Sequence, residues 1–414
     1  MTAQDSTFAK TGSYLNPGAH QGPRRLAGIL SLDDFEPAAR AFLPRPLFGY
    51  VAGAAERNAS LAANRDAFAD YAFRPRVLVD VSKRTQAVEL FGETWDAPFA
   101  IAPMGLCALT AYRGDLVLAR AAQAANIPMV LAGSSLIRME DVAQAAPRSW
   151  FQAYVPGAPK RIDALIGRVA DAGYRVLVVT VDLAVAGNRE NNVRNGFSTP
   201  LRPSLRLAWD GLTRPRWLLG TFARTLLAHG IPHFENSFFE RGAPIISPSV
   251  LRDFSARDHL NWTHLERIRA QWKGPLVVKG ILDPADAILA RDCGADGLVV
   301  SNHGGRQLDG AIAPLHALPA IAAAVPELPL LLDGGVRRGT DVLKALALGA
   351  RAVLLGRPPV YGLAHAGAAG VAQVLRLLRD ELEIAMALTG CATLADATPA
   401  LLLHPGAHGN STRA

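Results

Sequence analysis

The segment SNHGGRQLD (301–309) combines residue types that can act on a small anion. His303 can accept or release a proton near neutral pH, because an imidazole titrates in that range. Arg306 follows three residues later and can hold a carboxylate through two parallel hydrogen bonds. Asp182 ends a distant apolar run and can orient His303 and stabilise its protonated form if the two loops meet. The pattern indicates proton transfer on a substrate that carries a carboxylate.

Two glycine-rich segments with arginines lie nearer the end of the chain. They are LDGGVRRG (332–339) and LLGRPPVY (354–361). Glycines let the backbone approach an anion closely, and the N–H groups at a helix start bind phosphate. The two segments therefore predict a site for a phosphorylated cofactor or substrate. The alternative interpretation is that these glycines only form tight turns.

Eight short apolar runs, each bounded by polar, Gly or Pro residues, predict buried parallel strands. Stretches of helical period separate most of them, such as GDLVLARAAQAA and TDVLKALALGA. Eight alternating units predict an α/β fold that closes into a (β/α)₈ TIM barrel. No GxGxxG turn follows the first run, which weakens a dinucleotide-binding alternative. The runs cover residues 98–103, 128–132, 149–155, 176–182, 275–280, 296–302, 328–335 and 352–356.

The C-terminal ends of barrel strands gather around one pocket, where the βα loops meet. Polar residues and glycines at the predicted strand ends should therefore converge there, although any one of them alone would be more typical of a structural residue. They are Pro103, Gln152, Tyr154, Thr180, Asp182, Lys279, Ser301, His303, Arg306, Asp333, Arg337, Gly356 and Arg357.

The barrel is expected to occupy residues 31–395, with a helical cap before its first strand. A flexible tail (1–30) precedes it and a second tail (396–414) follows it. The connection after the fourth strand, residues 183–274, is far longer than a βα unit needs and is expected to have a purpose of its own. Its segment 200–230 carries five arginines against one aspartate, interleaved with Trp, Phe and Leu. That mixture fits a membrane surface and fits equally a lid packed on the barrel.

Composition limits the remaining classes. Half of the residues are apolar and 19% are charged, which is typical of a packed globular enzyme. Three widely spaced cysteines suggest neither a disulfide framework nor a metal site. No signal sequence and no apolar run of about 18 residues is present, so the protein is expected to be cytoplasmic, or peripheral on the inner face of the cytoplasmic membrane. The net charge of +7 does not by itself favour a nucleic-acid partner.

From about residue 30 to 395, the chain resembles the FMN-dependent L-2-hydroxy acid oxidases and dehydrogenases. The most specific likeness is SNHGGRQLD (301–309), supported by VKG (278–280), DGGVRRGTD (333–341), KALALGA (344–350) and LGRPPVYGLA (355–364). The resemblance implies FMN as cofactor and oxidation of a lactate- or mandelate-like 2-hydroxy acid to the 2-keto acid. It also implies a homo-oligomer, commonly a tetramer.

The resemblance assigns roles position by position. His303 matches the catalytic base and Asp182 its partner. Tyr50 and Arg306 match the pair that holds the substrate carboxylate, while Tyr154 matches the tyrosine at the reacting oxygen and Arg189 an arginine at the rim of the site. Positions that match flavin contacts are Pro103, Gln152, Thr180, Lys279, Ser301, Asp333, Gly335, Arg337, Gly356 and Arg357.

Some positions depart from the family pattern. Ala132 stands where a hydroxylated residue is frequent, unless Ser134 or Ser135 substitutes for it, and Met104 and Ala153 alter the expected pocket shape. The insertion resembles that of membrane-associated dehydrogenases, which indicates a quinone as electron acceptor. Oxygen is the alternative acceptor. Competing functions are a phosphate-binding barrel that uses FMN without net oxidation, and a catalytically silent barrel that binds membranes or partners.

Overall fold

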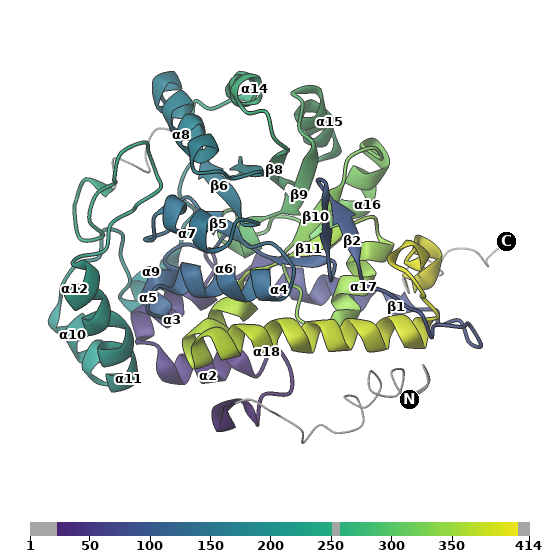
Figure 1. The fold of residues 1–414 in the computed structure, drawn as a ribbon, viewed down its shortest axis with the longest axis horizontal. Helices are drawn as coiled ribbons and strands as arrows, with labels where there is room; N and C mark the ends of the chain where they lie inside the picture. Colours follow the sequence, from purple (N-terminus) through teal and green to yellow (C-terminus); the bar gives the residue numbers. More distant parts are fainter. Residues whose placement is uncertain (1–22, 251–256, 405–414) are drawn as a thin grey trace.

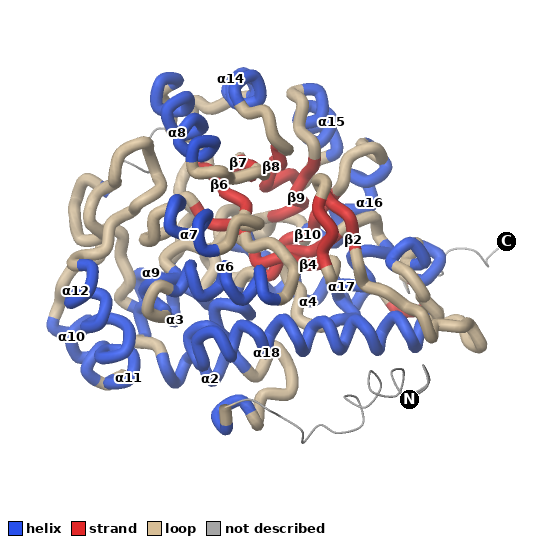
Figure 2. Tube along the Cα trace, in the orientation of Figure 1, coloured by secondary structure: helices blue, strands red, loops and turns tan. Residues whose placement is uncertain are grey.

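The computed structural model describes residues 23–250 and 257–404. At its centre, eight parallel strands are hydrogen-bonded in the order β4-β11-β10-β9-β8-β7-β6-β5 (Figures 1 and 2). A parallel bridge between Ile101 and Met129 joins the two end strands and closes the barrel. All eight predicted strands are confirmed: β4 (Phe99–Ile101), β5 (Val130–Ala132), β6 (Trp150–Tyr154), β7 (Leu177–Thr180), β8 (Leu276–Ile281), β9 (Gly297–Ser301), β10 (Leu330–Asp333) and β11 (Ala352–Leu355).

The strands form where β-branched and leucine side chains follow one another without interruption, because both faces of a barrel strand are buried. Residues of β7, β9 and β10 are buried throughout. Trp150, the first residue of β6, and Trp95 are almost fully buried, and their rings lie 5.4 Å apart. Helices surround the barrel: α6 (Gly114–Ala124), α7 (Met139–Ala145), α8 (Pro159–Asp171), α14 (Trp262–Gln271), α15 (Pro284–Asp292), α16 (Pro314–Ala324), α17 (Gly339–Ala347) and α18 (Arg357–Thr389).

The predicted helical cap precedes the barrel and consists of α2 (Phe35–Phe42), α3 (Arg45–Ala52) and α4 (Ala59–Asp66). It is followed by a hairpin of β2 (Val88–Leu90) and β3 (Glu93–Trp95). The last carbonyl groups of α3 have no partner within the helix. They accept hydrogen bonds from two arginines, Arg306 and Arg357, which lie at the C-terminal ends of the strands.

Parts of the two predicted tails that adjoin the barrel are packed against it in the structure. Residues 1–22 and 405–414 lie outside the described residues. Within the predicted N-terminal tail, Leu26 and Ile29 are buried. Within the predicted C-terminal tail, β12 (Leu402–Leu403) pairs with β1 (Ala72–Phe73). Apolar side chains at both places add to the barrel core, so the packed unit extends further than the pattern of strands and helices indicated.

The long connection between β7 and β8 contains α9 (Glu190–Asn195), α10 (Leu205–Leu212), α11 (Pro215–Trp217), a π-helical turn η3 (Leu218–Ala223) and α12 (Arg224–His229). Figure 1 shows α10, α11 and α12 at the edge of the molecule, well away from the barrel axis. The Trp217 indole N–H donates to the carbonyl of Leu109 at 2.7 Å and fastens this group of helices to the body.

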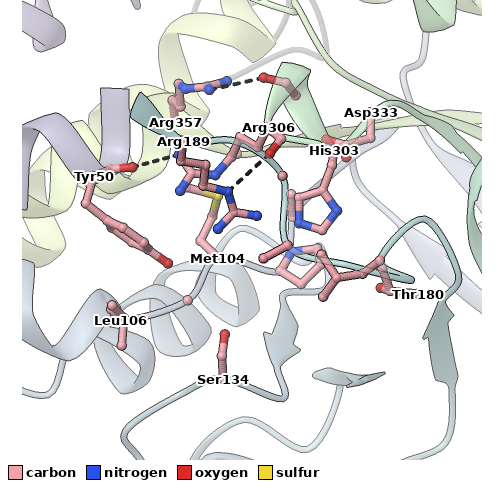
Figure 3. A pocket seen from close by; sticks show the side chains of 18 of the residues that line it. Tyr50, Met104, Leu106, Ser134, Thr180, Arg189, His303, Arg306, Asp333 and Arg357 are labelled. Atoms are coloured by element: carbon pink, nitrogen blue, oxygen red, sulfur yellow. Dashed lines mark hydrogen bonds between the residues drawn. The ribbon is translucent and has the colours of Figure 1, made fainter. Parts of the chain in front are cut away.

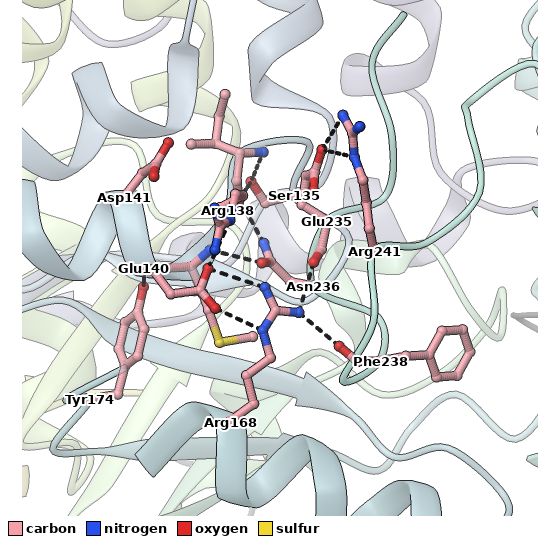
Figure 4. A network of polar contacts seen from close by, with 12 residues as sticks. Ser135, Arg138, Glu140, Asp141, Arg168, Tyr174, Glu235, Asn236, Phe238 and Arg241 are labelled. Atoms are coloured by element: carbon pink, nitrogen blue, oxygen red, sulfur yellow. Dashed lines mark hydrogen bonds and ion pairs between the residues drawn. The ribbon is translucent and has the colours of Figure 1, made fainter. Parts of the chain in front are cut away.

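A second attachment lies further along the connection (Figure 4). Arg168 of α8 bonds both carboxylate oxygens of Glu140 and also donates to the carbonyls of Glu235 and Phe238 at 2.9 and 2.8 Å. Asn236 accepts from the Met139 N–H at 2.8 Å, at the start of α7. Because α7 and α8 belong to the barrel, this network fixes residues 235–238 against it.

Candidate active site

A cavity of about 510 Å³ opens at the C-terminal ends of the strands (Figure 3). Most of the predicted site residues line it, which confirms that the strand ends converge as the sequence indicated. Gln152, Asp182 and Ser301 are not among the lining residues. Asp182 bonds His303, and Ser301 bonds Lys279 and Asp333, which do line the cavity. The predicted residues that line the cavity are Tyr50, Pro103, Tyr154, Thr180, Arg189, Lys279, His303, Arg306, Asp333, Gly335, Arg337, Gly356 and Arg357.

His303 and Asp182 meet although they end strands that are not neighbours. The His303 Nδ1 lies 2.9 Å from Asp182 Oδ1 and 3.2 Å from Oδ2. The strand between them, β8, has a register shift around Gly280, whose φ is +112°. A Cβ at position 280 would lie 2.7 Å from the Cβ of Asp182. Glycine is thus required for the aspartate to cross the end of β8 and reach the imidazole.

The electrostatics of the His303–Asp182 pair favour proton transfer. Burial, the largest influence, lowers the pKa of His303, and Asp182 acts in the opposite direction. Burial raises the pKa of Asp182, but the charge and hydrogen bond of His303, together with the charge of Lys279 and a backbone hydrogen bond, hold it below its ordinary value. A neutral imidazole held through Nδ1 leaves Nε2 for the cavity. The arrangement can accept a proton there and stabilise the resulting imidazolium.

Lys279 has its anionic partner within the protein. Its Nζ lies 2.7 Å from Asp333 Oδ2 and donates to Ser301 Oγ at 2.9 Å, while the Ser301 hydroxyl donates to the same carboxylate oxygen at 2.8 Å. Burial disfavours the ammonium, yet Asp333 and Asp182 more than compensate, so the pKa of Lys279 is raised. A fixed positive charge therefore stands at the mouth of the barrel, and Asp333 compensates it.

Arg306 is oriented by the carbonyl groups at the end of α3. One of its guanidinium nitrogens donates to the carbonyls of Tyr50 and Gly53, both at 2.7 Å, and its carbon lies 4.9 Å from the centre of the Tyr50 ring. Burial and the nearby Arg189 lower the pKa of Arg306 to about 9, so it stays charged at neutral pH. Arg189 in turn donates to the Arg306 carbonyl at 3.1 Å. Two guanidinium groups and a phenol thus share one side of the cavity and can hold a carboxylate.

The ends of the neighbouring strands β10 and β11 present a cradle suited to phosphate. Arg357, the first residue of α18, donates to the carbonyls of Val51, Gly53 and Gly304 at 3.1 Å each. Gly335 has a φ of +85°, and a Cβ there would lie 1.9 Å from the Asn64 carbonyl oxygen. Burial and Arg357 lower the pKa of Arg337 to about 10, so both arginines remain cationic. Two buried arginines beside a glycine backbone that another group can approach closely are a donor set suited to an anionic phosphate.

The side-chain amide of Gln152 also suits a planar polar cofactor. Its Oε1 accepts from the Gly133 N–H at 3.3 Å, whereas its Nε2 is buried and has no acceptor among the described residues. A buried amide donor is costly when unpaired. The carbonyl edge of a ring bound in the cavity would provide the missing acceptor.

The positions that depart from the family pattern differ in whether they line the cavity. Ala132 and Ala153 are buried and do not line the cavity, whereas Met104 does. Of the two candidate replacements for a hydroxyl, Ser134 lines the cavity, while Ser135 is buried and bonds Ile137. Only Met104 and Ser134 can therefore change what a ligand meets.

Several lining residues were not predicted because they come from the long connection and have no motif. They include Phe197, whose ring lies 4.6 Å from that of Tyr50, together with Val185, Val193 and Phe234. Arg257 is the charged member of this group. Its guanidinium carbon lies 5.1 Å from the centre of the Tyr154 ring.

A TIM barrel with a phosphate cradle, a buried cation for a planar cofactor and a His–Asp pair beside a carboxylate site defines a cofactor-dependent oxidoreductase barrel. Comparison with known proteins makes this specific. The family model described as FMN-dependent dehydrogenase matches residues 39–404. The chain belongs to this family, and it is an enzyme that uses FMN.

Sequence similarity to known relatives extends along nearly the whole chain. An L-lactate dehydrogenase of Caulobacter sp. (strain K31) is 44% identical over 375 residues, covering 88% of this chain and 96% of the relative. An L-lactate dehydrogenase of Xanthomonas axonopodis pv. citri (strain 306) is 45% identical over 377 residues, covering 89% and 95%.

Two solved structures show the same fold. The monotopic membrane protein (S)-mandelate dehydrogenase has a TM-score of 0.83 at 38% identity, covering 91% of this chain and 100% of that one. Mandelate oxidase with benzoyl-formic acid has a TM-score of 0.75 at 38% identity, covering 90% and 98%. The family expected from the sequence motifs is thus confirmed.

Proposed function

We propose that this enzyme oxidises a lactate- or mandelate-like L-2-hydroxy acid to the corresponding 2-keto acid. The observation that carries the proposal is the His303–Asp182 hydrogen bond of 2.9 Å in a cavity that Arg306 and Tyr154 also line. A base, an oxygen-binding phenol and a carboxylate-binding guanidinium are what removal of two electrons and two protons from a 2-hydroxy carboxylate requires.

In this proposal, Arg306 and Tyr50 hold the substrate carboxylate and Arg189 adds positive charge at the rim. Arg306 is suited to the task because the α3 carbonyls fix its guanidinium before a substrate arrives. Preorganised donors lose little freedom on binding, so more of their interaction energy appears as affinity.

His303 takes the hydroxyl proton of the substrate at Nε2, and Asp182 stabilises the imidazolium that forms. Tyr154 keeps its proton and donates a hydrogen bond to the same oxygen as the C–O bond becomes a carbonyl. Burial, followed by the nearby Tyr50 and Asp182, raises the pKa of Tyr154, so it remains a donor at neutral pH. Bound FMN supplies the two-electron acceptor for the hydrogen at Cα.

The FMN site that we propose has two parts. Around the ring are Pro103, Gln152, Thr180, Lys279 and Ser301, and along the side chain and phosphate are Asp333, Gly335, Arg337, Gly356 and Arg357. Lys279 would hold its positive charge beside the bound ring and would stabilise negative charge there.

The electron acceptor that we propose is a quinone, reached while α10–α12 rest on a membrane. Leu205, Trp209 and Leu227 are 92%, 67% and 89% exposed on these helices. Arg202, Arg206, Arg214, Arg216 and Arg224 lie in the same segment. Exposed apolar side chains among arginines suit the interface of an anionic bilayer. In the described part of the chain, the helices are too short or too polar to span one.

The test is anaerobic mixing of the purified protein with L-lactate, (S)-mandelate and 2-hydroxyoctanoate while the flavin band is followed. Rapid bleaching by one acid is the expected result, and recovery of colour with a quinone but not with air is expected for a dehydrogenase. Recovery with air would replace the quinone by oxygen. A flavin band that no hydroxy acid bleaches would refute the proposed reaction.

A further inference from the structure

Gln307 joins the loop after β9 to the long connection through its side-chain amide. Its Oε1 accepts a hydrogen bond from Arg189 Nη2 at 2.6 Å. Its Nε2 donates to the backbone carbonyls of Asp182 and Val185 at 3.2 and 3.1 Å. An amide offers one oxygen and two N–H groups, so each of them is engaged. Gln307 does not line the cavity itself. It can therefore act on the site only through the groups that it holds.

The two segments that Gln307 joins are in close backbone contact. A Cβ at Gly187 would lie 2.5 Å from the carbonyl oxygen of Arg306 and 2.6 Å from that of Gln307. Arg189 Nε also donates to the Arg306 carbonyl, at 3.1 Å. Arg189 thus uses Nε and Nη2 to bind two oxygens of one loop, while its side chain lines the substrate cavity. These two bonds orient its guanidinium.

The oxygens that hold Arg189 are both neutral, one from an amide and one from a peptide group. Burial is the largest influence on the pKa of Arg306, and the charge of Arg189 lowers that pKa further. Burial also has the largest influence at His303. There Asp182 raises the pKa, whereas the charges of Lys279 and Arg189 lower it. An amide at position 307 holds the arginine without cancelling this charge, which a carboxylate at the same place would do.

We propose that Gln307 is a positioning residue for substrate binding, whose amide holds the Arg189 guanidinium at the cavity with its charge available to the carboxylate of the 2-hydroxy acid. The inference rests on the proposed function and adds Gln307 to the residues on which binding depends. Arg306 repels Arg189, because both are cations in a partly buried site. The bond to Gln307 helps to offset this repulsion before a substrate arrives. The substrate carboxylate then meets two oriented guanidinium groups, which lose little freedom when they bind it.

The experiment measures two properties of Gln307→Met, which removes the amide and keeps an unbranched side chain of similar length. The first is the binding of pyruvate and of benzoylformate to the oxidised holoenzyme, followed by the change in the flavin spectrum. The second is the steady-state rate with the acid that reduces the flavin, measured as a function of pH. Both are repeated on Arg189→Met and on the double variant. The matched control is Gln123→Met, at an exposed position of α6.

Gln307→Met should weaken binding of the 2-keto acid and raise KM by about 10-fold, the lower end of the range for a hydrogen bond to a charged group. The value of kcat should change less, because the proton acceptor is unaltered. The acid limb of kcat/KM should move to higher pH, since a displaced Arg189 no longer lowers the pKa of His303. Arg189→Met should change the same properties in the same direction, and the double variant should add little to either single change. Gln123→Met should be native in each.

Gln307→Glu tests the charge separately and remains informative if Gln307→Met does not fold. A carboxylate at this position can still accept from Arg189, but it cancels the charge of the guanidinium. Binding of the 2-keto acid should therefore weaken by about 10-fold in this variant also. Native binding would overturn the inference, because an available charge on Arg189 would then be unnecessary.

The remaining outcomes separate this inference from the proposed function. Native KM in Gln307→Met, or losses that simply add in the double variant, would overturn the role of Gln307 and leave the reaction standing. An acid limb that moves to lower pH would do the same, because Gln307 would then act through its bond to the Asp182 carbonyl. A native flavin that no hydroxy acid bleaches would refute the proposed function, and this inference with it.

Discussion

The strand ends of the barrel and the long connection between β7 and β8 are built in different ways. At the strand ends, polar groups are buried and paired: His303 with Asp182, and Lys279 with Ser301 and Asp333. On α10–α12 of the connection, large apolar side chains such as Leu205 and Leu227 face outward. The first region is suited to fixed chemistry, and the second to contact with something outside the protein.

The connection nevertheless reaches the site. Arg189, Phe197 and Arg257 all come from it and all line the cavity. The attachments at Trp217 and Arg168 hold its middle against the barrel. The division that we propose is between a barrel that carries the reactive groups and a connection that lines the substrate side of the cavity and presents exposed apolar side chains. Variants in each region test that division.

The largest effect is expected from His303→Gln, which removes the proton acceptor and leaves the cavity shape nearly unchanged. Turnover should fall by about 10²–10⁴-fold, the usual contribution of one acid–base group. Flavin content should remain native, because His303 is assigned to the substrate. Flavin content is read from absorbance and turnover from steady-state rates. Native turnover in this variant would remove the imidazole from the reaction.

The second largest effect in the barrel is expected from Gly335→Ala, which should lower flavin content and stability. A Cβ at that position would lie 1.9 Å from the Asn64 carbonyl, and the φ of +85° is unfavourable for alanine. A strained residue costs about 1–3 kcal/mol before any clash is counted. Flavin content and thermal stability should both fall.

Gly92→Ala is the matched control for that variant. Gly92 has a φ of +75°, but a Cβ added there would meet no atom within 4 Å. The difference between the two variants therefore isolates the close approach at the phosphate cradle. Equal losses would show that backbone conformation alone matters at Gly335.

The pH dependence tests how the His303–Asp182 pair works. The base must be neutral to act, so kcat/KM should rise with pH through the pKa of His303, which burial places below its ordinary value of about 6.5. Asp182 acts to raise that pKa. Asp182→Asn should therefore move the acid limb to lower pH, while the plateau falls by about 10- to 100-fold because the imidazolium loses its charged partner. An acid limb that moves to higher pH would contradict this account.

The smallest effect on catalysis is expected on the connection. Replacing both Trp209 and Leu227 by Ser should reduce binding to anionic vesicles by about tenfold or more, since each apolar side chain loses part of its burial energy. The rate of flavin reduction should stay within about twofold, because neither side chain lines the cavity. Sedimentation with vesicles and rapid mixing measure the two properties. Leu388→Ser, at an exposed position of α18, is the control and should leave vesicle binding unchanged.

The barrel could be predicted from the sequence because its signal is local. Runs such as VLVVT and LLLD are buried on both faces, and that requirement leaves continuous apolar segments at regular intervals. Since every strand of such a barrel ends at the same rim, the ends of the runs also identified His303, Arg306 and Lys279. The same argument failed for Phe197 and Arg257, which lie on irregular segments without period or motif.

What the sequence determined by itself was therefore the eight strands, the rim on which the reactive side chains lie and the family to which they point. The tertiary structure alone decided which of those side chains meet. Gly280 leaves room for Asp182 to cross β8 and reach His303, and Asp333 pairs with Lys279. The α3 carbonyls orient Arg306 and Arg357. The guanidinium of Arg257 lies over the Tyr154 ring. These contacts join residues that are distant along the chain. A local pattern can specify burial and periodicity, but it has no physical means of specifying such partners.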